Sequence, residues 1–397
     1  MRKREFVKAI LDKVNGVSDK DWSEIHEEFN EETPCGVETL RKCGPVVKLM
    51  QETGIIGGSK ENENNLVYDP IKEIEEKSRE MKMERMKLQT EKLENNKWLR
   101  QGARDEMIME RIISAIKECP KPNLPAPISE ITYGGKKEWI LAFGDAHYGK
   151  EFCIKGLHGE IINEYSPEIF EKRMEKLLEE VMRICTKENI MRLHVYDLGD
   201  FAEGILRVGA LTQLRYGVIE STIRYAYFLS EWLNELSSFV KVRFQMCKGN
   251  HTELRMLGQP KGTFADENMI EVVRAMIKLR LAGNANFEMV ENPSGLIYDK
   301  VAGFDVLGVH GECGDLANAL HQFSNTYKVD IDYIIGAHIH HRKIGDVGRR
   351  RGAFSIKSLI GIDSYSMDLN KTSDPGAAMI GFSPENGDEI HYNIILR

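Results

Sequence analysis

Five short stretches of this 397-residue sequence combine glycine with acidic, amide or imidazole side chains. In chain order they read Gly144-Asp145-Ala146-His147, Gly199-Asp200, Gly249-Asn250-His251, His310-Gly311 and Gly336-Ala337-His338-Ile339-His340. Mixed nitrogen and oxygen donors without thiolates suit Mn²⁺, Fe or Zn²⁺ better than Ca²⁺. We therefore interpret the five stretches as the ligands of a metal site.

Each of these stretches follows an apolar run that reads as a buried strand, at 139–143, 193–198, 242–247, 305–309 and 333–335. Helical stretches are predicted between several of the strands, at 167–186, 215–238, 264–282 and 315–327. Strands that alternate with helices imply a layered α/β domain. Open α/β sheets bind ligands at the carboxyl ends of their strands, so we predict that the five stretches meet at one sheet edge.

The spacing within the stretches also suits a shared ion. In an extended chain, residues two apart point to the same side, so Asp145 with His147, and His338 with His340, are predicted to bind in pairs. A neighbouring glycine lets the backbone turn sharply and approach an ion. One such motif occurs by chance in many chains, but five of the eleven histidines fall inside this ordered set. The other histidines are interpreted as structural or surface residues.

The order of these motifs resembles the calcineurin-like metallophosphoesterase superfamily over residues 138–397, with an N-terminal helical extension of the kind found in some phage-encoded members. The resemblance implies an α/β fold, a four-layer β-sandwich flanked by helices, that holds two metal ions. It implies that one ion is bound by Asp145, His147, Asp200 and His340. Asp200 would bridge to a second ion, which is also bound by Asn250, His310 and His338. His251 would be the catalytic residue beside the scissile phosphate.

The sequence departs from the family pattern at one position. The family often places an acidic residue directly after the histidine of G-N-H, where it orients the imidazole. Here that position is Thr252, and the acidic residue is Glu253. Either Glu253, or another group such as Asp197, is expected to orient His251.

This ligand set predicts phosphoester hydrolysis. A carboxylate shared by two ions holds them about 3.5–4 Å apart. A water between the ions loses its proton near neutral pH and attacks phosphorus, while His251 protonates the leaving oxygen. We expect two divalent ions, Mn²⁺ first, with Fe or Zn²⁺ as alternatives. The sequence has no P-loop, G-x-G-x-x-G or H-E-x-x-H motif that would indicate another chemistry.

A nucleic-acid phosphodiester is the first hypothesis for the substrate. The triplet Arg349, Arg350 and Arg351 lies in a predicted hairpin turn after the last ligand stretch, where it would contact a phosphate backbone. Arg207 would clamp a substrate phosphate. Three aromatic residues are candidates for base stacking, namely Tyr148, Phe201 and Tyr365. The alternatives are a small-molecule phosphatase or cyclic-nucleotide phosphodiesterase, and a non-catalytic scaffold subunit.

The chain is predicted to have three parts: a small helical domain over 1–60, a long charged helix with a proline-rich linker over 61–137, and the metal domain over 138–397. In the first part, Ser18-Asp19 is a candidate N-cap and Gly44-Pro45 is expected to bend or interrupt a helix. Two short helices there allow a helix-turn-helix. The 70–118 helix is expected to form a homo-oligomer, and the linker at 119–127 is expected to be stiff and extended.

The composition excludes several classes of protein. A net charge of −8 provides no whole-protein attraction to nucleic acid, so such binding would need a local patch. No apolar run is long enough to span a membrane. The seven cysteines are scattered and form no C-x-x-C pair, which fits a reducing compartment. We therefore expect a cytoplasmic protein with no membrane partner.

Overall fold

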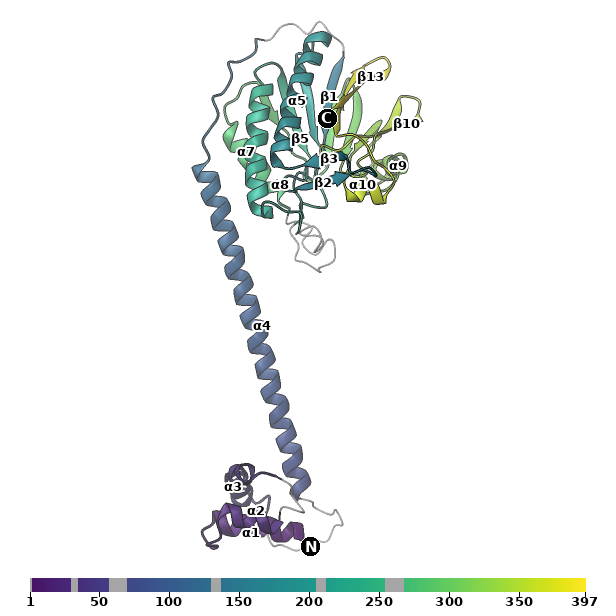
Figure 1. Cartoon of the computed structure of the whole chain (residues 1–397). Coiled ribbons are helices and arrows are strands. Elements are labelled where there is room, and N and C mark those ends of the chain that lie inside the picture. Colours follow the sequence, from purple (N-terminus) through teal and green to yellow (C-terminus); the bar gives the residue numbers. More distant parts are fainter. Residues whose placement is uncertain (1, 30–34, 57–69, 130–136, 205–211, 254–267) are drawn as a thin grey trace. The chain divides into compact units, whose positions relative to one another are not determined.

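The computed structural model describes residues 2–29, 35–56, 70–129, 137–204, 212–253 and 268–397 (Figure 1). The chain forms two compact units, Met1–Gly102 and Ala103–Arg397. The boundaries predicted from the sequence, after residues 60 and 137, remain a prediction. Within the described residues, no helix is both long and apolar enough to cross a membrane.

The first unit contains three short helices, α1 (Arg2–Val14), α2 (Trp22–Phe29) and α3 (Val37–Glu52). They share a small apolar core, whose buried members include Phe6, Ile10, Ile25, Leu40 and Val47. Residues 30–34, where a helix-turn-helix would need its turn, lie outside the described residues. The structure therefore confirms the helices but does not test that motif.

Two details of this unit differ from the prediction. The N-terminus of α2 is capped by Asp21 and not by Ser18-Asp19, because Asp21 Oδ1 accepts the backbone N–H of Ser23 at 2.6 Å. The helix α3 runs through Gly44-Pro45 without interruption. A Cβ at Gly44 would lie 3.0 Å from the Trp22 ring, so glycine there allows α3 to pack closely on α2. Tertiary packing thus outweighs the local preference for a break.

The predicted long helix is confirmed as α4 (Pro70–Glu118). The linker after it was expected to be stiff and extended. In the structure its backbone carbonyls accept hydrogen bonds from side chains of the second unit. Arg280 Nε donates to Pro120 O at 3.0 Å, Asn234 Nδ2 to Asn123 O at 2.8 Å, and Asn286 Nδ2 to Ala126 O at 2.9 Å. These bonds satisfy backbone carbonyls that proline-rich sequence cannot pair within itself.

The second unit contains two large sheets. In spatial order, the six-stranded sheet consists of β13 (Gly387–Ile395), β12 (Gly376–Ser383), β1 (Glu138–Phe143), β4 (Arg192–Asp197), β5 (Lys241–Met246) and β6 (Phe287–Met289). The five-stranded sheet consists of β10 (Lys343–Gly348), β11 (Arg351–Ser355), β9 (Tyr333–Gly336), β8 (Phe304–Val309) and β7 (Ile297–Val301). A separate hairpin is formed by β2 (Phe152–Lys155) and β3 (Ile161–Tyr165).

The two sheets stack face to face between layers of helices. Alternate residues of β1 show this arrangement, since Leu141 and Phe143 pack with the helices whereas Ile140 and Ala142 pack with the second sheet. The outer face of the six-stranded sheet is covered by α5 (Pro167–Glu188), α7 (Val218–Leu236) and α8 (Ile270–Arg280) (Figure 1). The five-stranded sheet is covered by α9 (Leu316–Tyr327). The predicted four-layer fold is confirmed.

The five predicted ligand strands are confirmed as β1, β4, β5, β8 and β9. They do not belong to one sheet, however. The first three run parallel in the six-stranded sheet, and the last two run parallel in the five-stranded sheet. The prediction of a single sheet edge was therefore wrong, because a run of buried strands does not reveal which sheet each strand joins. The ligand loops meet where the two stacked sheets end.

A buried polar cluster joins the two sheets. Asp299 of β7 lies 2.7 Å from His194 Nδ1 of β4 and accepts from Arg243 Nε of β5 at 3.2 Å. Tyr196 OH donates to the same carboxylate at 3.2 Å. Burial on its own raises the pKa of Asp299, but His194 and Arg243 outweigh burial, and the pKa is lowered. The folded state therefore favours the ionised carboxylate.

Replacing Asp299 with Asn should lower the free energy of unfolding at pH 7 by about 1–3 kcal/mol, because the buried donors lose a charged acceptor. A lowered folded pKa means that the stabilisation is fully present above the unfolded value near 3.9. It is lost as the pH falls through the folded pKa. Urea unfolding of wild type and variant at pH 7 and pH 3 tests this prediction. A difference in the free energy of unfolding that is as large at pH 3 as at pH 7 would contradict it.

Candidate metal centre

The loops that follow β1 and β4 lie side by side. Their backbones continue the parallel pairing of the two strands, since Asp145 N–H donates to Gly199 O at 3.0 Å and His147 N–H donates to Asp200 O at 2.9 Å. Tyr148 N–H donates to Phe201 O at 2.8 Å. These backbone hydrogen bonds hold the Asp145-Ala146-His147 segment against the Gly199-Asp200 segment independently of side-chain contacts.

Glycine at position 249 allows a third loop to join them. A Cβ on Gly249 would lie 2.2 Å from Asp200 Oδ1, so any larger residue would displace that carboxylate. His251 N–H donates to the same Asp200 oxygen at 2.8 Å. The glycine of G-N-H is thus needed for close packing of backbone on backbone.

Five of the predicted ligands adopt left-handed backbone conformations: Asp145 (φ 51°), His147 (φ 43°), Asp200 (φ 52°), His338 (φ 65°) and His340 (φ 52°). Alternate residues were predicted to face one side because the chain is extended there. The backbone is not extended at these residues, so that explanation was wrong. The members of each pair still reach the site, but through tight loops. Left-handed conformations are unfavourable for non-glycine residues and gather at functional sites, where the surrounding structure holds them.

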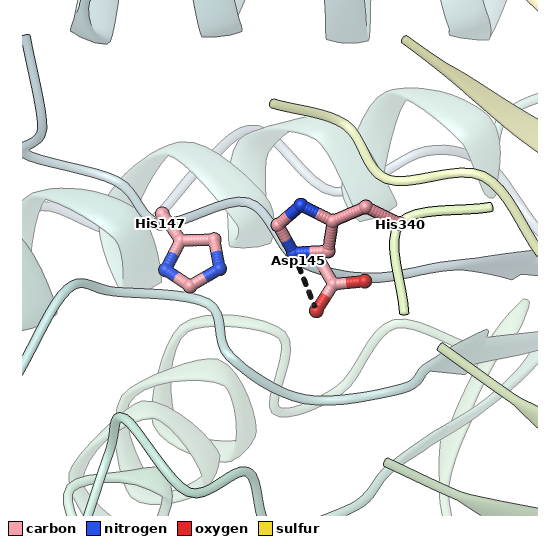
Figure 2. Close-up of side chains that lie close together, drawn as sticks. All are labelled: Asp145, His147 and His340. Atoms are coloured by element: carbon pink, nitrogen blue, oxygen red, sulfur yellow. Dashed lines mark ion pairs between the residues drawn. The ribbon is translucent and has the colours of Figure 1, made fainter. Parts of the chain in front are cut away.

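The first group of ligands comprises Asp145, His147 and His340, whose donor atoms lie within 4.8 Å of one another. Figure 2 shows the two imidazoles and the carboxylate around a shared space, and its dashed line joins His340 Nε2 to Asp145 Oδ1 at 3.6 Å. All three residues are buried. These are three of the four residues predicted for one ion.

The second group converges on His310 Nε2. That atom lies 2.9 Å from Asp200 Oδ2, 3.1 Å from Asn250 Oδ1 and 3.1 Å from His338 Nδ1. The four residues come from four different loops and are those predicted for the second ion. An imidazole nitrogen, a carboxylate, an amide oxygen and a second imidazole facing one another form a donor set for a cation.

The remaining ring nitrogens indicate which atoms are available to a metal. His147 Nδ1 faces Glu203 Oε2 at 2.8 Å, His340 Nδ1 faces Asp363 Oδ1 at 3.4 Å, and His310 Nδ1 faces Leu198 O at 2.8 Å. The carbonyl of Leu198 favours a proton on His310 Nδ1 and leaves Nε2 of that ring for a cation, and the two carboxylates lie within ion-pair distance of Nδ1 of the other two rings. Within the described part of the chain, Asp145 Oδ1, both ring nitrogens of His147 and His340 Nδ1 are buried without a hydrogen-bond partner. Because such orphaned atoms are costly, the first group fits a divalent cation. The second group fits one through its facing nitrogen and oxygen donors.

The ionisation of Asp200 and His338 favours cation binding, whereas that of His310 opposes it. Burial raises the pKa of Asp200, but the neighbouring His310 and His251 outweigh burial and hold that pKa well below its usual value. Burial and the nearby His310 lower the pKa of His338 to about 4, which keeps this ring neutral. Burial lowers the pKa of His310, but Asp200 outweighs burial and raises the pKa to about 9. At neutral pH a cation therefore competes with a proton at His310.

The catalytic candidate His251 is oriented by a residue that sequence reasoning missed. His251 Nδ1 lies 3.0 Å from Glu203 Oε1, so Glu203 fills the role that was proposed for Glu253 or Asp197. Asp197 instead accepts from Tyr225 OH at 2.8 Å. The available signal was the Gly-Asp-x-x-Glu spacing, which places Glu203 three residues after Asp200 and on the same loop. Lys150 and Asp363 were also missed, and no motif marks them.

The two ligand groups open into a pocket of about 640 Å³. Its described lining also includes Gln213, Glu312, Ser364 and Tyr365. Asn250, His251 and His338 are only partly buried and form its accessible wall. Of the three aromatic candidates for base stacking, Tyr148 and Phe201 are buried in the core, and only Tyr365 lines the pocket.

Of the arginines predicted to bind substrate, the structure describes only the triplet, and it does not bring that triplet to this centre. Arg207 lies outside the described residues. The triplet Arg349–351 does lie at a hairpin turn, between β10 and β11. Because β11 runs parallel to β9, with Gly352 opposite Tyr333, the turn lies at the amino end of β9, whereas His338 follows its carboxyl end. Arg351 is also paired with Asp330.

The structure thus combines two stacked sheets between layers of helices with two groups of candidate metal ligands at the ends of the strands. Similar folds occur in solved structures. They include a dimetal phosphatase from Danio rerio (9% identity over 66% of this chain and 99% of that chain, TM-score 0.35). Another is a metallophosphoesterase from Sphaerobacter thermophilus (12% identity over 65% of this chain and 89% of that chain, TM-score 0.31). The likeness concerns the fold alone.

One relative aligns over nearly the whole chain. The SPbeta prophage-derived uncharacterized protein YonJ of Bacillus subtilis (strain 168) is 31% identical over 405 residues, which cover 97% of this chain and 95% of that protein. The YonJ coiled-coil domain family also matches residues 77–119, within and just beyond α4. Because this identity extends across both the helical extension and the metal domain, the chain belongs to the YonJ family.

Proposed function

We propose that this protein is a binuclear metal-dependent phosphoesterase that cleaves phosphodiester bonds, with nucleic acid as its substrate. The observation on which the proposal rests is the convergence of Asp200, Asn250 and His338 on His310 Nε2, beside the group of Asp145, His147 and His340. Two divalent cations bound there would supply positive charge for the phosphoryl oxygens and would activate water. Mn²⁺ is the proposed ion, because the donors are nitrogen and oxygen without sulfur.

His251 is the proposed general acid. It lines the pocket, and its Nε2 lies 4.0 Å from Asp200 Oδ2, on the side of the ligands. Glu203 holds Nδ1 and therefore leaves Nε2 to face the leaving oxygen. Burial lowers the pKa of His251, but Asp200 and Glu203 together outweigh burial and raise it. A raised pKa favours the protonated ring, which is the form able to donate a proton.

Two features support a nucleic-acid substrate. The accessible wall of Asn250, His251 and His338 can be reached by a phosphodiester within a longer chain. Tyr365 also lines the pocket, where its ring packs near the rings of His338 and His340, and an aromatic ring at a pocket wall is a candidate to stack on a base. The pocket volume of about 640 Å³ is in the range of small-ligand sites, so it would admit a nucleotide unit and not a duplex.

A small-molecule phosphatase or cyclic-nucleotide phosphodiesterase is the second candidate, and one observation favours it. Among the described residues that line the pocket, Lys150 is the only lysine or arginine, and it is buried. Nucleic-acid binding normally depends on several such contacts with phosphates. The distinction between the two candidates therefore requires an experiment.

The test is hydrolysis by the purified full chain with Mn²⁺, and separately with Mg²⁺, Zn²⁺ and Fe²⁺. Single- and double-stranded DNA and RNA are compared with bis-p-nitrophenyl phosphate, p-nitrophenyl phosphate and cyclic nucleotides. We expect Mn²⁺-dependent cleavage of the diester and of single-stranded polymers. Hydrolysis confined to monoesters or cyclic nucleotides would reject the nuclease, and no hydrolysis with any metal would reject the phosphoesterase.

We also propose that α4 forms a homo-oligomeric coiled coil. The support is the family match at 77–119 and the exposure of large apolar side chains along this helix, among them Met81, Met86, Leu88 and Leu93. Most of the stability of a helix in a protein comes from packing of its apolar side chains against a neighbour, so exposed apolar residues on α4 favour a partner. A second copy of the same helix would provide that cover.

Light scattering of the full chain should give a multiple of 45.3 kDa. The double variant Met86→Lys and Leu93→Lys should shift the mass toward one chain, because two charges would enter the apolar contact. Glu84→Gln with Glu91→Gln, on the same exposed helix, changes the net charge by the same two units and serves as the charge-matched control. A wild-type protein that is monomeric at all concentrations would rule out this self-association.

A further inference from the structure

Lys150 lies three residues after His147, in the wall of the metal pocket, and is 7% exposed. Its ammonium nitrogen lies 3.5 Å from Glu203 Oε2 and 3.6 Å from Asp363 Oδ2. The two carboxylates come from different parts of the fold. Glu203 is on the loop after β4, and Asp363 caps the helix α10 (Ser364–Asp368). Lys150 is therefore the cation between them.

Each of these carboxylates faces a ligand histidine of the same metal group. Glu203 Oε2 lies 2.8 Å from His147 Nδ1, and Asp363 Oδ1 lies 3.4 Å from His340 Nδ1. Acceptors on Nδ1 fix the tautomer and the orientation of a ligand imidazole. Each of these histidines thus has, at ion-pair distance from its Nδ1, one of two carboxylates that share one lysine.

The backbone holds Lys150 and Asp363 in place. Lys150 forms a β-bridge with Leu214, and the next residue, Glu151, donates its N–H to Gln213 O at 2.7 Å. Asp363 Oδ1 accepts the N–H of Ser366 at 2.9 Å within a capping box. The ammonium group also lies 5.7 Å from the centre of the Phe152 ring. Lys150 is therefore positioned by the fold and not by a substrate.

Charge explains why a cation is needed here. Glu203 and Asp363 are each about 2% exposed, beside the buried carboxylates of Asp145 and Asp200. Buried like charges repel strongly unless a cation pairs with them. Without Lys150, Glu203 and Asp363 would have to take up protons or turn away from the histidines. Either change would weaken the acceptors on His147 and His340.

We propose that Lys150 is a positioning residue of the metal centre, whose ammonium holds Glu203 and Asp363 against the two histidines of the Asp145 group. The inference rests on the proposed metal centre and extends it beyond the ligands themselves. A direct contact between Lys150 and a substrate phosphate is a different role. It would require the phosphate to replace the two carboxylates that already flank the ammonium group.

The test is titration of the metal-free full chain with Mn²⁺ alone, by calorimetry and by electron paramagnetic resonance. For wild type we expect two bound ions. For Lys150→Met we expect the affinity for one ion to fall about 10–100-fold, as is usual when outer-shell partners of a metal are removed. The ion bound through His310 should be retained. Lys150→Arg should restore most of the loss, and Lys155→Met, an exposed lysine on β2, should behave as wild type.

A second variant guards against a folding defect in Lys150→Met. Asp363→Asn keeps an N-cap for α10 but removes the charge, and it should weaken the same ion to a similar degree. Two Mn²⁺ ions bound by both variants with wild-type affinity would overturn the role of Lys150. If affinity is kept and only KM for a phosphodiester rises, Lys150 contacts substrate instead. A wild-type protein that binds no Mn²⁺ would refute the metal centre itself.

Discussion

Asp200→Asn should lower phosphodiester hydrolysis on the order of 10³-fold while the protein stays folded. Asp200 is buried, its Oδ2 lies 2.9 Å from His310 Nε2, and the resemblance described above implies that it bridges the two ions. Asparagine keeps an oxygen to accept the N–H of His251 but lacks the negative charge. Loss of an ion that stabilises the transition state by several kcal/mol corresponds to a rate loss of this size.

Metal analysis distinguishes this explanation from unfolding. Bound Mn²⁺ should fall from two ions per chain to one or none, with an unchanged circular dichroism spectrum. Asp346→Asn is the matched control, because Asp346 is exposed on β10 and is not among the pocket residues. Full activity of Asp200→Asn with two bound ions would show that Asp200 does not bridge.

His251→Gln should lower the rate about 10²–10⁴-fold with both ions retained, because His251 is a proposed proton donor and not a ligand. The loss should depend on the leaving group. An activated nitrophenolate leaves without a proton, so bis-p-nitrophenyl phosphate should be affected less than an alkyl phosphodiester. Initial rates for both esters at saturating Mn²⁺ provide the measurement.

The neighbouring Glu203 supplies a second comparison. Glu203→Gln should also slow the alkyl ester, because His251 Nδ1 loses its charged partner at 3.0 Å. It should additionally weaken one Mn²⁺ ion, since the other Glu203 oxygen faces His147. His251→Gln should leave Mn²⁺ affinity unchanged. Equal losses on the two esters for His251→Gln would contradict its role as a general acid.

The ligands could be predicted from the sequence because each combines a chemically distinctive side chain with a glycine or a strand end. His310 is an example, since it stands alone in the sequence but follows a buried strand and precedes Gly311. The same strand signals predicted β1, β4, β5, β8 and β9. The candidate ligands and the strands that precede them therefore follow from local patterns, whereas the sheet to which each strand belongs does not.

The residues that support the ligands follow from tertiary contacts instead. Asp363 lies 23 residues after His340 and resembles an ordinary helix cap, yet its carboxylate faces that imidazole. Lys150 resembles any surface lysine until the fold buries it between two carboxylates. The arginine triplet shows the opposite error, because nearness to His340 in sequence does not indicate which end of β9 a hairpin turn will occupy. Sheet pairing decides these questions, and no short motif encodes it.

The left-handed backbone at Asp145, His147, Asp200, His338 and His340 has a consequence for protein engineering. Each such residue costs roughly 1–2 kcal/mol, which the surrounding ladder and sheets must offset. A peptide that carries only Asp-Ala-His or His-Ile-His would relax to other conformations and lose the convergence. Grafting only these motifs onto another scaffold would therefore not reproduce the centre. The strands that precede the loops, in both sheets, and the loops themselves would have to be transferred as well.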